Sequence, residues 1–184
     1  MYQKKINTAI IGATGYVGLD LILLLSNHPN VNIKFLCAQK NIGKNIQYFD
    51  KRIKKKLPLI SKSSNLNFNL IDLVYLSLPN GEAQKFIKKN IRFKHLKFID
   101  LSADFRINNP SIYKKWYGNN HNAKNLISKS LYSISEFVQK DIKNFRIISN
   151  PGCYPTSIQL PLAPLIKKKL IKNNNIIIDS KSGY

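Results

Sequence analysis

The chain has 184 residues, of which 43% are hydrophobic and 10% aromatic, so it can bury a core and is not globally disordered. Its apolar runs are too short to cross a bilayer and its start lacks a signal-peptide pattern, so we expect a cytoplasmic protein without a membrane partner. The net charge of +21 comes from 26 Lys and 4 Arg spread among many Asn and Ile; we interpret it as compositional drift and expect no nucleic-acid partner.

The first 38 residues predict a strand, a helix and a second strand. Residues 6–11 form an apolar run that ends at a glycine cluster, residues 15–25 place apolar side chains on one helical face, and residues 31–38 form another apolar run. A helix between two such strands implies a parallel sheet.

A GxxGxxG pattern, with its glycines at Gly12, Gly15 and Gly18, joins the first strand to the helix. In a dinucleotide-binding turn, the first glycine permits the turn, the second admits the pyrophosphate and the third lets helix and strand pack closely. The helix N-terminus adds N–H donors and a positive dipole. A tight turn without a ligand is the alternative. We expect these residues to bind the cofactor: Gly12, Thr14, Gly15, Tyr16, Val17 and Gly18.

The end of the second strand favours NADP(H) over NAD. An NAD site places a carboxylate there for the ribose hydroxyls, but after the second strand no acidic residue occurs until Asp50. We expect Ala38 and Lys40 to contact the cofactor, with Lys40 or Lys44 meeting the 2′-phosphate. Cys37 is interpreted as a small buried hydrophobic residue.

The remaining chain alternates between strand-like and helix-like segments, which predicts an α/β fold: a Rossmann-like, doubly wound parallel sheet. The segment 39–69 has no clear pattern, and 108–130 is expected to be a loop. We expect strands at 71–78, 97–101, 146–149 and 176–179, and helices at 81–89 and 155–170.

Cys153 lies where a predicted strand meets a predicted helix, after Gly152 and before Pro155, which suits a first helical turn. A helix N-terminus favours the thiolate, the form that acts as a nucleophile. A buried structural cysteine is the alternative. With two cysteines and no cluster of Cys and His, we expect neither a disulfide framework nor a metal site.

Three motifs resemble those of the N-acetyl-γ-glutamyl-phosphate reductases, NADPH-dependent enzymes of arginine biosynthesis. They are the glycine turn 12–18, the segment Ile99-Asp100-Leu101-Ser102-Ala103-Asp104-Phe105-Arg106 and the segment Asn150-Pro151-Gly152-Cys153-Tyr154-Pro155-Thr156. The resemblance implies that Cys153 attacks the acyl phosphate of N-acetyl-L-glutamyl 5-phosphate, that phosphate leaves, and that NADPH reduces the thioester to N-acetyl-L-glutamate 5-semialdehyde.

The resemblance also implies roles for individual residues. Arg106 would bind the substrate phosphate; the alternative is a surface salt bridge, for which Asp104 is a possible neighbour. Asn150 would position the acyl group. Thr156 is expected to cap the helix after Cys153. The loop 78–81 would lie next to the cofactor, with Asn80 acting as a loop residue. The remaining expected cofactor contacts are Pro79, Ser182 and Gly183.

The resemblance divides the chain into an NADP-binding domain, residues 1–150, and the beginning of a second α/β domain, residues 151–184. Reductases of this family are longer, and their second domain supplies a general acid/base histidine and most of the dimer interface. We therefore expect a truncated chain, a homo-oligomer for the full-length family, and structural or solvent roles for His28, His95 and His121.

Three alternatives stay open at this point. A related reductase of lysine biosynthesis would act on a longer acyl phosphate. A non-catalytic module would bind NADPH without turnover that depends on Cys153. A basic nucleic-acid-binding protein would need clustered Arg and exposed aromatic residues, and neither is evident in the sequence.

Overall fold

The computed structural model describes residues 4–181, and the chain divides into two compact units after Asn150. Within the described residues, the first unit contains a seven-stranded sheet and four α-helices, and the second contains one α-helix. The strands are β1 (Ile6–Ile11), β2 (Val31–Cys37), β3 (Ile60–Ser61), β4 (Leu73–Leu76), β5 (Lys97–Asp100), β6 (Ser130–Tyr132) and β7 (Ile147–Ser149). The helices are α1 (Tyr16–Ser26), α2 (Glu82–Asn90), α3 (Pro110–Tyr117), α4 (Lys124–Ile127) and α5 (Cys153–Lys167).

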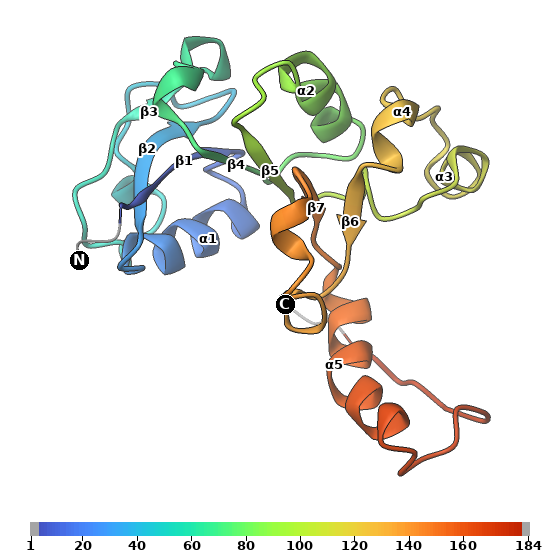
Figure 1. Cartoon of the computed structure of the whole chain (residues 1–184). Coiled ribbons are helices and arrows are strands. Elements are labelled where there is room, and N and C mark those ends of the chain that lie inside the picture. The colour runs from blue at the N-terminus through green and yellow to red at the C-terminus, as the bar shows by residue number, and fades with distance from the viewer. Residues whose placement is uncertain (1–3, 182–184) are drawn as a thin grey trace. The chain divides into compact units, whose positions relative to one another are not determined.

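The sheet has the strand order β3-β2-β1-β4-β5-β7-β6, and every pair of neighbouring strands is parallel. Figure 1 shows α1 on one side of the sheet and α2 on the other. The predicted α/β class with a doubly wound, Rossmann-like sheet is therefore confirmed.

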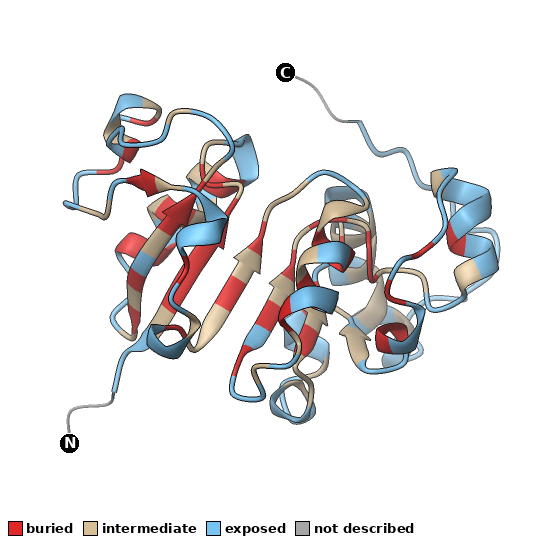
Figure 2. Ribbon diagram, turned by 90° about the horizontal axis from the view of Figure 1, so that it is seen from above, coloured by how far each residue is buried: buried red, intermediate tan, exposed pale blue. Residues whose placement is uncertain are grey.

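Alternation along the strands builds a core on each face of the sheet. In β1, Ala9 and Ile11 join the cluster that contains Ile87 of α2, whereas Ile10 joins the cluster that contains Ile22 of α1. All five side chains are at most 5% exposed. Figure 2 shows the buried residues concentrated in the strands. Because a parallel sheet is covered on both faces, its strands read as continuous apolar runs.

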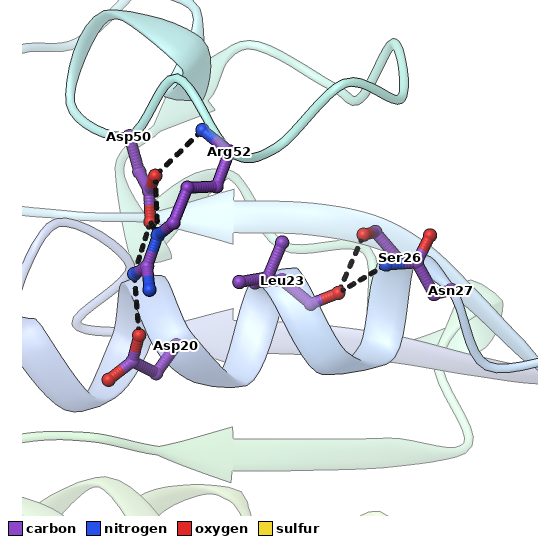
Figure 3. A network of polar contacts seen from close by, with 6 residues as sticks. All are labelled: Asp20, Leu23, Ser26, Asn27, Asp50 and Arg52. Carbon is purple, nitrogen blue, oxygen red and sulfur yellow. Dashed lines mark hydrogen bonds and ion pairs between the residues drawn. The ribbon is translucent and has the colours of Figure 1, made fainter.

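An arginine ties α1 to the segment that follows β2 (Figure 3). The Arg52 guanidinium donates to both carboxylate oxygens of Asp50 at 2.7–3.0 Å and, through Nη2, to Asp20 of α1 at 2.7 Å. These bonds to Arg52 lower the pKa of Asp50. At the other end of α1, the side chains of Ser26 and Asn27 donate to the Leu23 carbonyl. Arg52 thus joins α1 to the segment after β2, and the side chains of Ser26 and Asn27 satisfy a carbonyl at the C-terminal end of the helix.

The expectation of a loop at 108–130 was wrong, because the segment contains α3 and α4. The Asn109 side chain accepts hydrogen bonds from the backbone N–H groups of Ser111 and Ile112, Pro110 occupies the first turn, and Gly118 ends α3 with a φ of 75°. Asn, Pro and Gly are frequent in loops, but at these positions they cap the two ends of a helix.

Three shorter elements also differ from expectation. Strands β3 and β6 have only two and three residues, so they leave no alternating pattern in the sequence. Residues 176–179 form no strand, and Ile177 is 94% exposed. A run of isoleucines is not sufficient for a strand when no neighbouring strand accepts its hydrogen bonds.

Within residues 4–181, no helix has both the length and the apolar character needed to cross a membrane.

Candidate functional site

The carboxyl ends of the central strands lie in one row. Cys37 pairs with Ile11, Ile11 with Leu76, Leu76 with Asp100, and Asp100 with Ser149. Each of these residues is the last of its strand, so the loops that follow all start from the same edge of the sheet. Ligands of open α/β sheets bind at this edge. The row explains why the glycine turn and the segments 77–81 and 101–106, remote in sequence, belong to one region.

Gly12 and Gly18 of the glycine turn are required by packing. Gly12 has a φ of +87°, and a Cβ there would lie 1.8 Å from the Ser77 carbonyl oxygen at the end of β4. A Cβ on Gly18 would lie 2.2 Å from the Gly12 carbonyl oxygen. Both contacts are with backbone atoms, which cannot move aside, so any larger residue forces the turn, α1 and β4 apart.

Gly15 has no such packing requirement. A Cβ there would meet only the Gly12 carbonyl oxygen, at an ordinary 3.6 Å, and the residue is exposed with a φ of −80°. Gly15 is also the N-cap of α1 and provides no side-chain cap for the first N–H groups of the helix. The bare backbone at Gly15 therefore leaves the helix N-terminus open to an anionic ligand.

A cavity of about 440 Å³ opens beside this turn. Of the residues expected to bind a cofactor, the cavity is lined by Gly12, Thr14, Gly15, Ala38 and Pro79. It is not lined by Tyr16, Val17, Gly18 or Lys40. Ser182 and Gly183 lie outside the described residues.

Several lining residues were not identified from the sequence. Gln39 and Ser63 come from the segments after β2 and β3, and one face of α2 forms another wall. Because β2 and α2 are separated by about 45 residues, only the strand order β2-β1-β4 reveals that they enclose one cavity. The lining residues missed on α2 are Glu82, Lys85, Phe86 and Lys89.

Asp104 caps α2. Its buried carboxylate accepts hydrogen bonds from the backbone N–H groups of Gly81 (2.7 Å) and Gln84 (3.0 Å) and from the Tyr113 hydroxyl (2.9 Å). The same hydroxyl lies 2.9 Å from Asn80 Oδ1, and burial raises the pKa of Tyr113. The possible salt bridge between Asp104 and Arg106 is not what the structure shows: the oxygens of Asp104 satisfy a helix N-terminus, and Arg106 donates to backbone carbonyls.

Arg106 bridges the ends of two strands. Its Nη2 donates to the Leu101 carbonyl (3.0 Å) and its Nε to the Asn150 carbonyl (2.9 Å), which occupies two of the five N–H donors of the guanidinium. The Asn150 N–H in turn donates to the Asp100 carbonyl at 2.8 Å. Arg106 and Asn150, both expected to contact substrate, are thus brought together at the carboxyl edge of β5 and β7.

Asp100 is a buried carboxyl at the same edge. Its Oδ1 accepts from the N–H and the hydroxyl of Ser102, the latter at 2.6 Å. Within the described part of the chain, its Oδ2 and Ser149 Oγ are buried without a hydrogen-bond partner. Burial raises the pKa of Asp100 to about 6, although the bonds from Ser102 act in the opposite direction.

None of the three histidines is a clear catalytic group. His121 is buried; its Nε2 donates to the Asp104 carbonyl and its Nδ1 accepts from the Ala123 N–H, while burial lowers its pKa. His95 bonds the Phe68 carbonyl, and His28 accepts from the Asn30 N–H through Nδ1. The two hydrogen bonds of His121 require a neutral imidazole, which supports the loop that contains Asp104.

The two cysteines have different environments. Cys37 is fully buried, and burial raises the pKa of its thiol. Cys153 is exposed and is the first residue of α5, whose N-cap is Gly152. The expectation that Thr156 caps this helix was wrong, because Thr156 lies inside the first turn and its N–H donates to the Gly152 carbonyl. Cys153 therefore has the exposure and helix position that a nucleophile needs.

Across the described residues, no group of three or more His, Cys, Asp or Glu side chains could hold a metal ion.

Two families match the chain. "Semialdehyde dehydrogenase, NAD binding domain" matches residues 7–145, and "Semialdehyde dehydrogenase, dimerisation domain" matches residues 153–184.

Curated relatives share a more specific name. The chain is 43% identical over 181 residues to a probable N-acetyl-gamma-glutamyl-phosphate reductase, chloroplastic, of Oryza sativa subsp. japonica, covering 98% of this chain and 43% of that protein. It is 44% identical over 183 residues to the N-acetyl-gamma-glutamyl-phosphate reductase of Ehrlichia canis (strain Jake), covering 97% of this chain and 51% of that protein. The chain thus spans about half the length of the curated relatives it matches.

Solved structures with the same fold include two aspartate semialdehyde dehydrogenases. The Vibrio cholerae enzyme II, complexed with ASA, has a TM-score of 0.63 at 20% identity and covers 89% of this chain and 47% of that one. The Candida albicans enzyme with NADP has a TM-score of 0.59 at 20% identity, and the match covers 90% of this chain and 48% of that one.

Alanine substitutions at Gly18 and Gly15 should differ in their effect on stability. Gly18→Ala should lower the free energy of unfolding by about 3 kcal/mol or more, because its Cβ collides with backbone. Gly15→Ala should lower it by less than about 1 kcal/mol, since the site is open and the change affects only the N-cap. Urea denaturation of the two variants checks this; equal losses would show that the turn is not packed as described.

The raised pKa of Asp100 should make the free energy of unfolding depend on pH. Its pKa of about 6 in the folded chain exceeds the ordinary 3.8, so the folded state holds the proton more tightly. The protonated Asp100 therefore stabilises the folded state fully below pH 4, and this contribution is lost as the pH rises through 6. The free energy of unfolding falls by about 3 kcal/mol over that range. Denaturation of wild type and Asp100→Asn at pH 4.5 and 7 should show the wild type losing more stability; parallel pH profiles would refute the assignment.

Proposed function

The chain belongs to the semialdehyde dehydrogenase family, and from that membership we propose that it binds NADP(H) and reduces an acyl phosphate to an aldehyde. The substrate we propose is N-acetyl-L-glutamyl 5-phosphate and the products are N-acetyl-L-glutamate 5-semialdehyde and phosphate, as in arginine biosynthesis. The observation that carries the proposal is the row of strand ends, which gathers a dinucleotide-type turn, its cavity and Arg106 at one edge.

The described residues fit a dinucleotide. Gly15 has no packing reason to be a glycine, yet a side chain there would occupy the space where a pyrophosphate approaches the first N–H groups of α1. The cavity beside it has room for a nucleotide. The residues we assign to the cofactor are Gly12, Thr14, Gly15, Tyr16, Val17, Gly18, Ala38, Lys40, Pro79, Ser182 and Gly183.

NADP(H) is the form we propose. The segment after β2 has no carboxylate to bind the ribose hydroxyls of NAD, and its first acidic residue, Asp50, is bonded to Arg52. The ligand in the structurally similar Candida albicans enzyme is NADP. When bound, the reduced cofactor supplies the hydride for the reaction.

The residues of the chain perform the other steps. Arg106 binds the phosphate of the substrate through guanidinium N–H groups, while two of its donors stay on strand-end carbonyls and hold the group in place. The Cys153 thiolate attacks the acyl carbon; a C–S bond forms, the C–O bond to phosphate breaks, and phosphate leaves with the electron pair. Asn150 positions the acyl group. Reduction of the thioester then releases the aldehyde and returns the thiolate.

Gly15→Ala tests the cofactor part of the proposal. The variant should keep its fold but bind NADP⁺ at least about tenfold more weakly, because the new methyl group fills the space of the pyrophosphate. Calorimetric titration of wild type and variant with NADP⁺ and NAD⁺ measures this. Equal affinities for NADP⁺ would place the cofactor elsewhere, and tighter binding of NAD⁺ by the wild type would reverse the cofactor preference.

Cys153→Ser tests the chemistry. Without nucleotide, N-acetylglutamyl phosphate should transfer one acyl group to the wild type with release of one phosphate, and none to Cys153→Ser; intact-mass spectrometry detects the difference. Cys37→Ser is the matched control and should still be acylated, because Cys37 is buried.

The same assay separates the alternatives. Preferential acylation by the acyl phosphate with one more methylene group would identify a relative from lysine biosynthesis. NADP⁺ binding with no acylation by either compound would identify a non-catalytic nucleotide-binding module.

A further inference from the structure

One face of α2 forms a wall of the proposed cofactor cavity. Glu82, Lys85, Phe86 and Lys89 all line it, and their spacing of i, i+3, i+4 and i+7 places them on a single side of the helix. At 1.5 Å per residue this face extends for about 10 Å, the scale of a nucleoside monophosphate. The face begins next to the Pro79–Gly81 turn, and the same cavity is also lined by Ala38, Gln39 and Ser63 from the segments after β2 and β3.

The lysines of this face differ in their partners. Lys85 Nζ lies 2.7 Å from Glu82 Oε1, so these two charges offset one another at the start of the face. Lys89 lies one turn further along and adds a net positive charge to the lining. The other wall contributes the neutral Gln39 and Ser63, which can donate hydrogen bonds but carry no charge.

The lysines expected from the sequence to select the cofactor lie differently. Lys40 is exposed, as are Lys85 and Lys89, but unlike them it does not line the cavity. Lys44 Nζ lies 4.7 Å from the centre of the Tyr48 ring, a cation–π distance. The positive charge that the cavity itself presents therefore comes from α2.

The position of α2 is fixed. The Asp104 carboxylate binds the N–H groups of Gly81 and Gln84 at its start, and Ala83 and Ile87 are fully buried against the sheet. The lysine face is consequently held toward the cavity by a cap on one end and by the core on the opposite side.

We infer that Lys89, assisted by Lys85, is a specificity-determining residue that binds the 2′-phosphate of NADP(H) from the α2 side of the cavity. The inference rests on the proposed cofactor function and extends it to a wall that the expected cofactor contacts do not include. A phosphate at this position meets an ammonium group on α2 and hydrogen-bond donors from Gln39 and Ser63. An unphosphorylated ribose gains nothing from Lys89.

The test compares 2′,5′-ADP with 5′-AMP as probes, which differ in the phosphate that Lys89 is inferred to bind. Lys89→Ala should weaken binding of 2′,5′-ADP and NADP⁺ about tenfold and change binding of 5′-AMP and NAD⁺ less than about twofold. Lys85→Ala should show a smaller loss of the same selectivity, and Lys89→Arg should retain it. Calorimetric titration of the full chain gives each dissociation constant.

Lys88→Ala is the matched control. Lys88 is exposed on the same helix but does not line the cavity, so its removal changes the net charge equally and should leave both affinities unchanged. If Lys88→Ala weakens binding of 2′,5′-ADP as much as Lys89→Ala does, the effect comes from the net charge of the protein and the inference is overturned.

The remaining outcomes separate the inference from the proposed function. If the wild type binds NADP⁺ and selects it over NAD⁺, but Lys89→Ala leaves that selectivity intact, the inference fails and the cofactor proposal stands; Lys40→Ala then identifies whether the loop after β2 is responsible. If the wild type binds neither nucleotide, both are overturned.

Discussion

The buried carboxylate of Asp104 is the interaction on which the site depends. The N-cap of helix α2 is Gly81, which has a left-handed conformation and no side chain to cap the helix, so the first N–H groups need an acceptor from elsewhere. Asp104 supplies it from the segment after β5 and also accepts from the Tyr113 hydroxyl of α3. His121 binds the carbonyl of the same residue. A buried polar group is tolerated only when such donors surround it, so this one side chain links α2, α3 and the segment after β5.

The glycine turn divides its tasks between packing and binding. Gly12 and Gly18 let the backbones of β1, β4 and α1 approach to distances that no side chain permits. That close approach brings the start of α1 to the edge where the strands end. Gly15 contributes nothing to this packing; it is the N-cap of α1 and leaves the first N–H groups of the helix without a side-chain cap. Packing thus requires glycine at two of the three positions, and Gly15 is the position at which a substitution can test ligand binding without disturbing the core.

The sequence predicted what is encoded locally. Apolar runs and the glycine spacing were sufficient for β1, α1, β2 and the parallel sheet, because each depends on contiguous residues. The cap by Asp104 could not be predicted, since it joins residues 20 or more positions apart, and proximity in sequence suggested Arg106 as the partner instead. Helix α3 was predictable, because Asn109 and Gly118 are ordinary capping signals. The α2 wall required the strand order, which local patterns do not contain.

The position of each lysine matters more than their number. The chain has a net charge of +21, yet charges more than about 8 Å apart at physiological ionic strength are largely screened from one another. Most of the lysines therefore add little to the field inside one cavity, and their abundance alone cannot select a nucleotide with one more phosphate. Selection requires a cation whose direction is fixed relative to the bound ribose. Within the cavity lining, Lys85 is paired with Glu82, and Lys89 is the lysine that we infer to have this role.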